Sequence, residues 1–325
     1  MVSLRLPGLL LFVLLHAAAS AAPASYKGAI VVDADSGDVL FEDNAGYVGP
    51  PASVTKLMSF LIVKDQIKAG RITRETPVTT TAADARIGGT QVWLKEKEVF
   101  TVEELLMAMM IKSANDAAHA LSHTAAESRE AFVAAMNERA RELGMNDTTW
   151  RTPHGLPPSS RKLIESDVTS PRDLAVLSRT LLRETDVLRY TSIALAYFGE
   201  GKRAQPVMMD NHNNLVGKVR GVDGLKTGYT ASAGFCLAAT AERDGRRLIG
   251  VIMGSPSTKD RDMKMAQLLE ASFAKLLDVA PPPAPSGGPP SISRVPLDAD
   301  DLQIEPANDA ETEEEPPMVR FNLPR

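Results

Sequence analysis

Short apolar runs bounded by turn residues predict strands near both ends of the chain. A Ser36-Gly37 turn divides the first two runs, which predicts an opening β-hairpin. Asp244-Gly245 separates the last two runs, and an Asp-Gly pair favours the tight turn of an antiparallel hairpin. The predicted strands cover residues 28–35, 39–41, 222–230, 233–240 and 247–253.

Helical spacing of apolar residues dominates the middle of the chain and returns near its end. Thr101 has the character of an N-cap for one helix, and Gly144 that of a C-cap for another. The predicted helices cover residues 56–64, 101–111, 129–143 and 259–277, with an alanine-rich helix after 116. We therefore expect an α/β mixed (α+β) fold. One mixed sheet would be closed by the two ends of the domain, and the active site would lie between it and a helical lobe.

The ends of the 325-residue chain differ in composition from its centre. Arg5, a leucine-rich run and an A-x-A site ending near Ala21 predict a signal peptide over 1–21 and a periplasmic protein secreted across the inner membrane. Retention of this segment as an anchor stays open. Proline-rich and acidic composition predicts a disordered tail over 281–325, leaving 25–280 as the folded domain.

Composition excludes several classes of function. The net charge of −5 gives no reason to expect nucleic-acid binding, and the single cysteine, Cys236, excludes an internal disulfide. His119 and His123 are one helical turn apart, but no third ligand accompanies them in the sequence, so we expect neither metal nor cofactor. Peripheral membrane association and a protein partner docking on the tail remain open.

The first candidate motif is Ser53-Val-Thr-Lys56 near the start of a predicted helix. A serine hydroxyl needs an adjacent base to become a nucleophile, and residues three apart on a helix are neighbours. Lys56 could be that base if burial and a second cation, such as Lys226, lowered its pKa. The alternative is an N-cap serine followed by a solvated lysine.

A second motif, Ser113-Ala-Asn115, interrupts the helical pattern. Ser and Asn compete for backbone hydrogen bonds, so both are natural at a helix junction. In the functional interpretation, Ser113 passes a proton to the leaving group, while the Asn115 amide holds Lys56 and the substrate.

The third motif, Lys226-Thr-Gly228, lies on a predicted strand. Lys226 and Thr227 could bind a carboxylate and a carbonyl, and Gly228 would let another backbone approach closely. The alternative is a basic edge strand that discourages aggregation.

The three motifs together resemble the D-alanyl-D-alanine carboxypeptidases, low-molecular-mass penicillin-binding proteins of the S11 peptidase type. Segments 151–156, 170–177 and 210–215 follow in the expected order. The resemblance covers roughly residues 25–280. It implies a β-lactamase/DD-peptidase-like fold with a central antiparallel sheet flanked by helices plus a helical lobe.

The resemblance also implies roles for named residues. Ser53 attacks the carbonyl between the last two D-alanines of a peptidoglycan stem peptide, and Lys56 takes its proton. Ser113 and Asn115 help the proton reach the departing D-alanine. The substrate is bound by Lys226, Thr227, Gly228, Tyr229 and Thr230, with the backbone N–H groups of Ser53 and Tyr229 as the oxyanion hole. β-Lactams would acylate Ser53 and stay bound.

Two positions depart from the family pattern. His212 stands where an arginine is usual and would bind a carboxylate only when protonated; the alternative is a structural histidine in a loop. We therefore expect turnover to fall more steeply above neutral pH than in an arginine enzyme, and a His212→Arg variant with an unchanged pH profile would contradict this. Tyr229 replaces a common histidine and could reshape the leaving-group pocket.

Other activities of the same site stay open. A DD-endopeptidase would use the same acyl-enzyme. A β-lactamase would need a glutamate for the deacylating water, and Glu142 has a suggestive spacing but falls in the last turn of a predicted helix. A non-hydrolytic cell-wall sensor would lack a reactive residue, whereas all three motifs keep theirs.

Overall fold

A computed structural model describes residues 25–160 and 162–277. The predicted signal peptide (1–21) and the predicted tail (281–325) lie outside the described residues. Within the described part, none of the helices has both the length and the apolar character needed to cross a bilayer.

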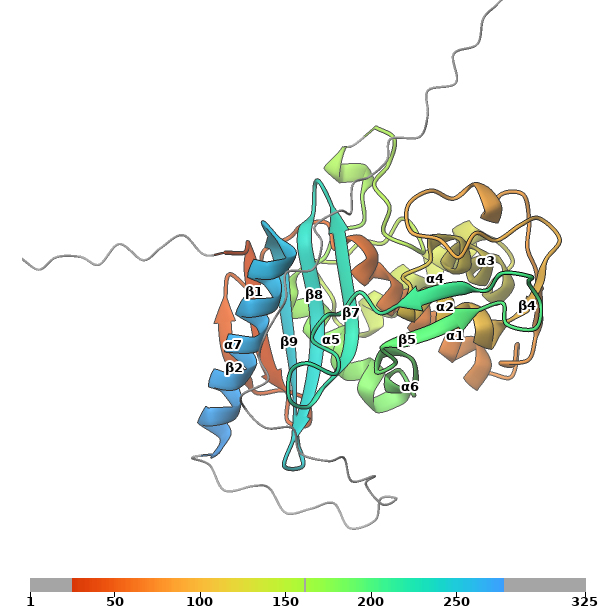
Figure 1. Cartoon of the computed structure of the whole chain (residues 1–325). Coiled ribbons are helices and arrows are strands. Elements are labelled where there is room, and N and C mark those ends of the chain that lie inside the picture. The colour runs from red at the N-terminus through yellow and green to blue at the C-terminus, as the bar shows by residue number, and fades with distance from the viewer. Residues whose placement is uncertain (1–24, 161, 278–325) are drawn as a thin grey trace, which may run out of the picture.

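The strands of the main sheet come from both ends of the described chain, and most of the helices come from its middle (Figure 1). The strands are β1 (Gly28–Asp33), β2 (Val39–Asp43), β3 (Pro77–Thr79), β4 (Val99–Thr101), β5 (Leu195–Phe198), β6 (Val207–Asp210), β7 (Val222–Thr230), β8 (Gly234–Arg243) and β9 (Arg246–Ser255). The helices are α1 (Lys56–Lys68), α2 (Val102–Ile111), α3 (Asn115–Ala125), α4 (Arg129–Glu142), α5 (Pro171–Glu184), α6 (Leu188–Thr191) and α7 (Thr258–Leu277). Short 3-10 turns are η1 (Ala52–Thr55), η2 (Asp84–Arg86) and η3 (Leu163–Glu165).

The main sheet has five strands in the order β2-β1-β9-β8-β7. Every neighbouring pair is antiparallel, so the expectation of a mixed sheet is wrong and the antiparallel sheet implied by the resemblance is confirmed. The β1–β9 pairing, in which Gly28 lies opposite Met253, joins the two ends of the domain as expected. This pairing leaves β7 at the edge of the sheet beside the helical lobe.

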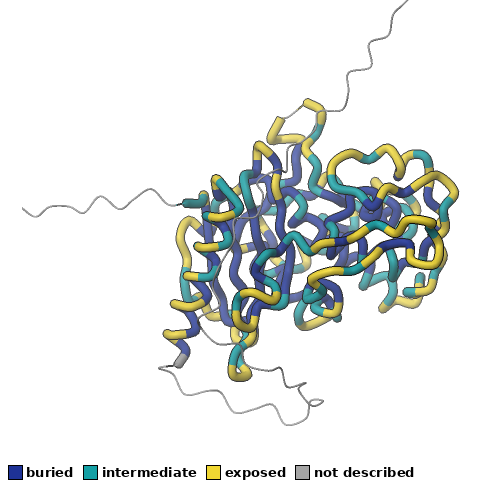
Figure 2. Tube along the Cα trace, viewed as in Figure 1, coloured by how far each residue is buried: buried dark blue, intermediate teal, exposed yellow. Residues whose placement is uncertain are grey.

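The two faces of the sheet are covered by different helices, because side chains alternate between the faces of a strand. Ala29 and Val31 pack in a cluster with α7, whereas Ile30 and Val32 belong to the larger cluster that includes α1 and α5. Figure 1 shows α7 lying across the sheet, and Figure 2 shows the central strands buried between these layers.

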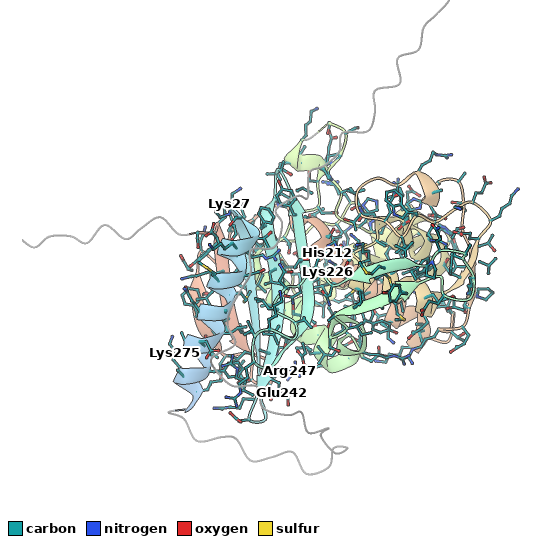
Figure 3. The ribbon with its side chains drawn as sticks, viewed as in Figure 1. Lys27, His212, Lys226, Glu242, Arg247 and Lys275 are labelled. Carbon is teal, nitrogen blue, oxygen red and sulfur yellow. The ribbon has the colours of Figure 1, made fainter. Side chains whose placement is uncertain are left out.

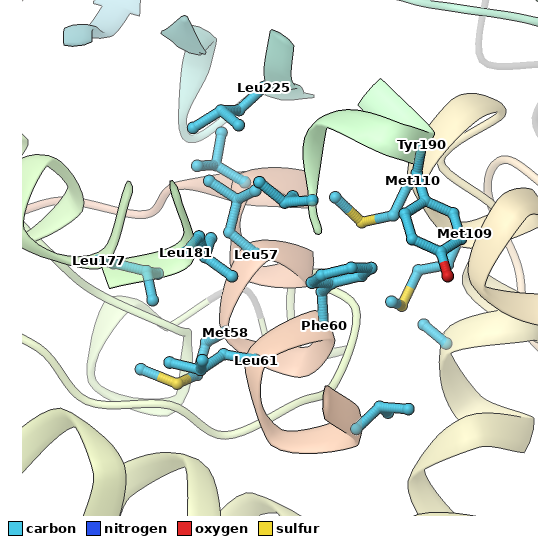
Figure 4. Close-up of a cluster of buried hydrophobic side chains, with 14 of the residues drawn as sticks. Leu57, Met58, Phe60, Leu61, Met109, Met110, Leu177, Leu181, Tyr190 and Leu225 are labelled. Atoms are coloured by element: carbon cyan, nitrogen blue, oxygen red, sulfur yellow. The ribbon is translucent and has the colours of Figure 1, made fainter. Parts of the chain in front are cut away.

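Helix α1 is the centre of the larger core. It is apolar on nearly every side, and its residues from Lys56 to Val63 are all buried, as expected for a helix surrounded by protein. Figure 4 shows its side chains reaching α2, α5, α6 and β7 at once. The ring of Phe60 meets that of Tyr190 edge-on, with centroids 5.2 Å apart. Burial of α1 therefore fixes the position of the turn that precedes it.

Local sequence rules explain several boundaries. Thr101 is the N-cap of α2, as predicted, and it forms a reciprocal capping box with Glu104. Asp244 and Gly245 both have positive φ in the β8–β9 turn, the backbone that the Asp-Gly pair favours. The two-stranded sheets β3–β4 and β5–β6 were not predicted, because their strands are only three or four residues long.

The core around α1 makes a direct stability prediction. Leu61 is fully buried, so Leu61→Ala should lower the free energy of unfolding by about 2–5 kcal/mol through lost burial and a residual cavity. The matched variant Leu163→Ala, at a residue 55% exposed, should cost no more than roughly 0.5 kcal/mol. Urea denaturation followed by circular dichroism measures both. Equal losses in the two variants would contradict the assigned core.

Candidate active site

Ser53 lies in η1, directly before α1, against the edge strand β7. A side chain at Gly228 would place its Cβ 2.4 Å from the carbonyl oxygen of Pro51 and 2.9 Å from the nitrogen of Ser53. Only glycine therefore permits this close approach of β7. Ala52 has φ +52°, a left-handed conformation that is uncommon for a residue with a Cβ other than Asn or Asp.

Lys56 is fully buried one turn after Ser53 and makes three polar contacts. Its Nζ lies 2.9 Å from Ser53 Oγ, 2.6 Å from Asn115 Oδ1 and 2.9 Å from the carbonyl oxygen of His154. As an ammonium ion it donates to all three oxygens. As a neutral amine it has two N–H groups and one lone pair. The two carbonyl-type oxygens can only accept, so the lone pair is left for the Ser53 hydroxyl.

The surroundings of Lys56 favour its neutral form. Burial, reinforced by the charge of Lys226, holds the pKa of Lys56 well below its ordinary value. The carboxyl groups of Asp116 and Asp167 oppose this shift but do not cancel it. These are the two causes, burial and a second cation, that the sequence interpretation required.

Asn115 begins α3 with its side-chain amide held at both ends. Its Oδ1 accepts from Lys56, its Nδ2 donates to the carbonyl oxygen of Gly88 at 2.9 Å, and its backbone N–H donates to Thr90 at 2.8 Å. The loop that carries Gly88 and Thr90 therefore sets which way the amide points. Ser113, two residues earlier, is buried and has φ +64°. Asn115 is thus fixed at the start of α3, and Ser113 lies in the turn between α2 and α3.

The third motif occupies β7 as predicted. Lys226 and Thr227 are buried, and Lys226 Nζ donates to the carbonyl oxygen of Thr227 at 3.0 Å. Tyr229 is 39% exposed and stacks on Phe235 of β8, with ring centroids 4.2 Å apart. Thr230 Oγ1 lies 3.2 Å from Ser232 Oγ. The strand therefore presents buried polar groups beside Ser53 and an exposed aromatic ring beyond them.

A loop that the motif analysis did not assign completes the site. The carbonyl oxygen of His154 contacts Lys56, and a Cβ on Gly155 would lie 2.0 Å from the oxygen of Ala52. Asp167, buried, accepts from the backbone N–H groups of Arg151 and Thr152 and so holds this loop in place. The only sequence signal was the segment 151–156, which contributes through backbone atoms.

His212 is near the site but is not the cation that the sequence interpretation required. Figure 3 shows it beside Lys226. Burial and nearby positive charges lower the pKa of His212 to about 3, so the imidazole is neutral in the free protein. The charges belong to Lys226, Lys112, Lys56 and Arg261. This lowered pKa argues against the carboxylate-binding role, which would need a protonated His212, and the positive potential comes from its neighbours.

Two other sequence interpretations can be checked. Glu142 lies in the last turn of α4, where its exposed carboxylate pairs with Arg139 at 3.1 Å, so it does not resemble a residue that activates water at Ser53. The sequence close to His119 and His123 contains no third metal ligand for them, but the fold brings in a residue from elsewhere in the chain. The fold brings Asp84, from η2, to within 2.6 Å of His119 Nδ1.

Comparison with known proteins places this site in a family. A family model described as D-alanyl-D-alanine carboxypeptidase matches residues 16–257. D-alanyl-D-alanine carboxypeptidase DacF of Bacillus subtilis is 33% identical over 249 residues, which are 77% of this chain and 62% of the relative. DacA of Escherichia coli is 34% identical over 252 residues, which are 75% of this chain and 60% of the relative. The chain thus spans about three fifths of the length of these relatives.

Solved structures agree with the sequence relatives. The D-alanyl-D-alanine carboxypeptidase DacD from Francisella tularensis superposes with a TM-score of 0.72 at 27% identity, covering 77% of this chain and 70% of that one. Penicillin-binding protein D2 from Listeria monocytogenes, in its ampicillin-bound form, has a TM-score of 0.68 at 30% identity and is covered to 97%. The family match runs from β1 through β9 and includes all three motifs, and this chain belongs to the D-alanyl-D-alanine carboxypeptidase family of serine peptidases.

Proposed function

We propose that this protein is a serine-type D-Ala-D-Ala carboxypeptidase that removes the terminal D-alanine from peptidoglycan stem pentapeptides through an acyl-enzyme on Ser53. The observation that carries the proposal is the contact of Lys56 with Ser53, in surroundings that lower the pKa of the lysine. A neutral amine at hydrogen-bond distance is what a serine nucleophile needs in the absence of a catalytic histidine.

Acylation begins when Ser53 Oγ attacks the carbonyl carbon of the penultimate D-alanine and its proton moves to Lys56 Nζ. The backbone N–H groups of Ser53 and Tyr229 stabilise the negative charge on the tetrahedral intermediate. The peptide C–N bond then breaks, and the departing amine receives a proton by way of Ser113. The products of this step are free D-alanine and an ester of Ser53.

Deacylation uses the same groups with water as the nucleophile. The neutral form of Lys56 takes a proton from water, hydroxide adds to the ester carbonyl, and the proton returns to Ser53 Oγ as the C–O bond breaks. Asn115 keeps the lysine in place in both steps because its own amide is tied to the Gly88 loop. A β-lactam would enter by the same acylation and leave slowly, because its opened ring stays attached near Ser53.

The anionic end of the substrate would be met by the positive potential around β7. Lys226 and Thr227 lie on the strand that approaches Ser53, and Lys112 and Arg261 add positive charge near His212. Thr230, one residue after Tyr229, would hold the terminal carboxylate. We place this reaction in the periplasm, because that compartment holds peptidoglycan and the N-terminal pattern is that of a secretory signal.

Replacement of the nucleophile tests the proposal most directly. Ser53→Ala should reduce D-alanine release from a stem pentapeptide by roughly 10⁴-fold or more and abolish a covalent adduct with labelled penicillin. Ser36→Ala, in the exposed turn between β1 and β2, is the matched control and should retain both. Release that persists in the Ser53 variant would rule out this mechanism. An adduct without release in the wild type would point to a different substrate.

The charge of Lys226 should control the pH dependence of acylation. Lys56 acts as a base only above its pKa, so acylation falls as the pH drops through that value. Lys226→Gln removes a like charge that lowers the pKa of Lys56, and the acid limb should therefore move to higher pH. Stopped-flow measurement of the saturating acylation rate against pH shows this shift. Lys275→Gln, on the distant α7 helix, should leave the limb in place.

A neutral His212 makes a separate prediction. Because the pKa of His212 lies near 3, His212→Gln should change the rate without changing the shape of the pH profile between about pH 5 and 8. The comparison uses kcat/KM for D-alanine release, normalised to the maximum for each protein. An alkaline limb near neutral pH in the wild type that vanishes in the variant would restore the protonated-histidine hypothesis.

A further inference from the structure

Two histidines of α3 and one aspartate of η2 converge away from the Ser53 site. His119 Nδ1 lies 2.6 Å from Asp84 Oδ1, and His123 Nε2 lies 3.2 Å from each oxygen of the same carboxylate. One ligand atom from each side chain lies within 4.8 Å of the other two, and in the described part of the chain no other group of three or more His, Cys, Asp or Glu side chains meets this condition.

The geometry points to a metal site: we propose that Asp84, His119 and His123 bind a divalent transition-metal ion of the zinc class. Two histidines four residues apart lie on one face of a helix and can ligate the same ion. Imidazole nitrogen and carboxylate oxygen are both zinc ligands, at about 2.0–2.2 Å. Three such ligands leave one position of a tetrahedral ion for water or another small ligand.

The observed spacing is close to what an ion requires. Ligand atoms at about 2.1 Å from a tetrahedral centre are roughly 3.4 Å apart. The 3.2 Å separations between His123 and Asp84 nearly meet that value, and the 2.6 Å contact of His119 needs to open by less than about 1 Å.

The carboxylate is already held by a second layer of contacts. Asp84 is fully buried, and its Oδ2 accepts from the backbone N–H of Thr81 at 2.7 Å and from the Thr81 hydroxyl at 2.8 Å. Support of this kind orients a ligating carboxylate and strengthens the site. His123, with 29% of its side chain exposed, gives the ion a path from solvent.

A bound ion would clamp a loop that also serves the catalytic residues. Segment 81–94 is fixed to α3 at Asn115, through Gly88 and Thr90, and at Asp116, whose carboxylate accepts from the backbone N–H groups of Val92 and Leu94. The proposed site adds a fixed point at the start of this segment, on the same helix (Figure 1). The ion would act as a positioning element for Asn115, remote from the reacting atoms.

The test measures metal binding on the full chain without reference to catalysis. Protein stripped by a chelator is titrated with Zn²⁺ by calorimetry and with Co²⁺ by visible absorption, which reports tetrahedral coordination. We expect one ion per chain and at least tenfold weaker binding in His123→Gln. His212→Gln is the matched histidine control and should bind as the wild type does. Absence of saturable binding, or equal binding by the His123 variant, would overturn the site.

Two further measurements show whether the His123→Gln variant is folded and whether the bound ion clamps segment 81–94. Circular dichroism confirms that His123→Gln is folded, and Zn²⁺ should raise the midpoint of thermal unfolding of the wild type but not of the variant. Hydrogen exchange should slow for the backbone N–H groups of 84–92 when Zn²⁺ is added. Unchanged exchange alongside tight binding would overturn the clamp. Because none of these readouts needs turnover, failure of the metal site and failure of the proposed carboxypeptidase activity are distinguishable.

Discussion

The buried amine of Lys56 is the constraint on which the site depends. A fully buried lysine is costly as an ammonium ion, so its burial both requires polar partners and favours the neutral form. Three separate parts of the chain supply those partners: the Ser53 turn, the start of α3 and the loop at His154. The same burial that stabilises the core around α1 therefore prepares the base, and stability and reactivity have a common origin.

The catalytic surroundings also contain backbone strain. Ala52, next to the nucleophile, has positive φ, and so does Ser113 of the second motif. Conformations of this kind cost about 1–3 kcal/mol each and persist only where packing over-determines them. Here Gly155 and Gly228 approach the Ala52–Ser53 backbone from two sides, where a Cβ would collide. The backbone of the nucleophile is therefore held by one loop and one strand, in addition to the contact of its hydroxyl with Lys56.

The sequence predicted what depends on local chemistry. The helix at Lys56, the N-cap at Thr101 and the Asp-Gly hairpin each follow from spacing within a few residues. The three motifs lie at the start of α1, at the junction of α2 and α3, and on β7, as expected. What escaped prediction depends on distant partners. The carbonyl of His154, the aspartate facing His119 and the four cations around His212 have no local pattern, because the fold alone brings them together.

The pairing of β1 with β9 has a consequence for synthesis of the chain. The first strand pairs with β2 on one side, but its other partner is the last strand, and β7 reaches the Ser53 turn only as part of the sheet that β8 and β9 continue. Such distant pairings make folding slow and late. A growing chain that carries the Ser53 and Lys56 motif but has not yet emerged through β9 has no folded sheet to bury the lysine. Its serine is then an ordinary alcohol, so the order of synthesis itself delays the appearance of a reactive group until the domain is whole.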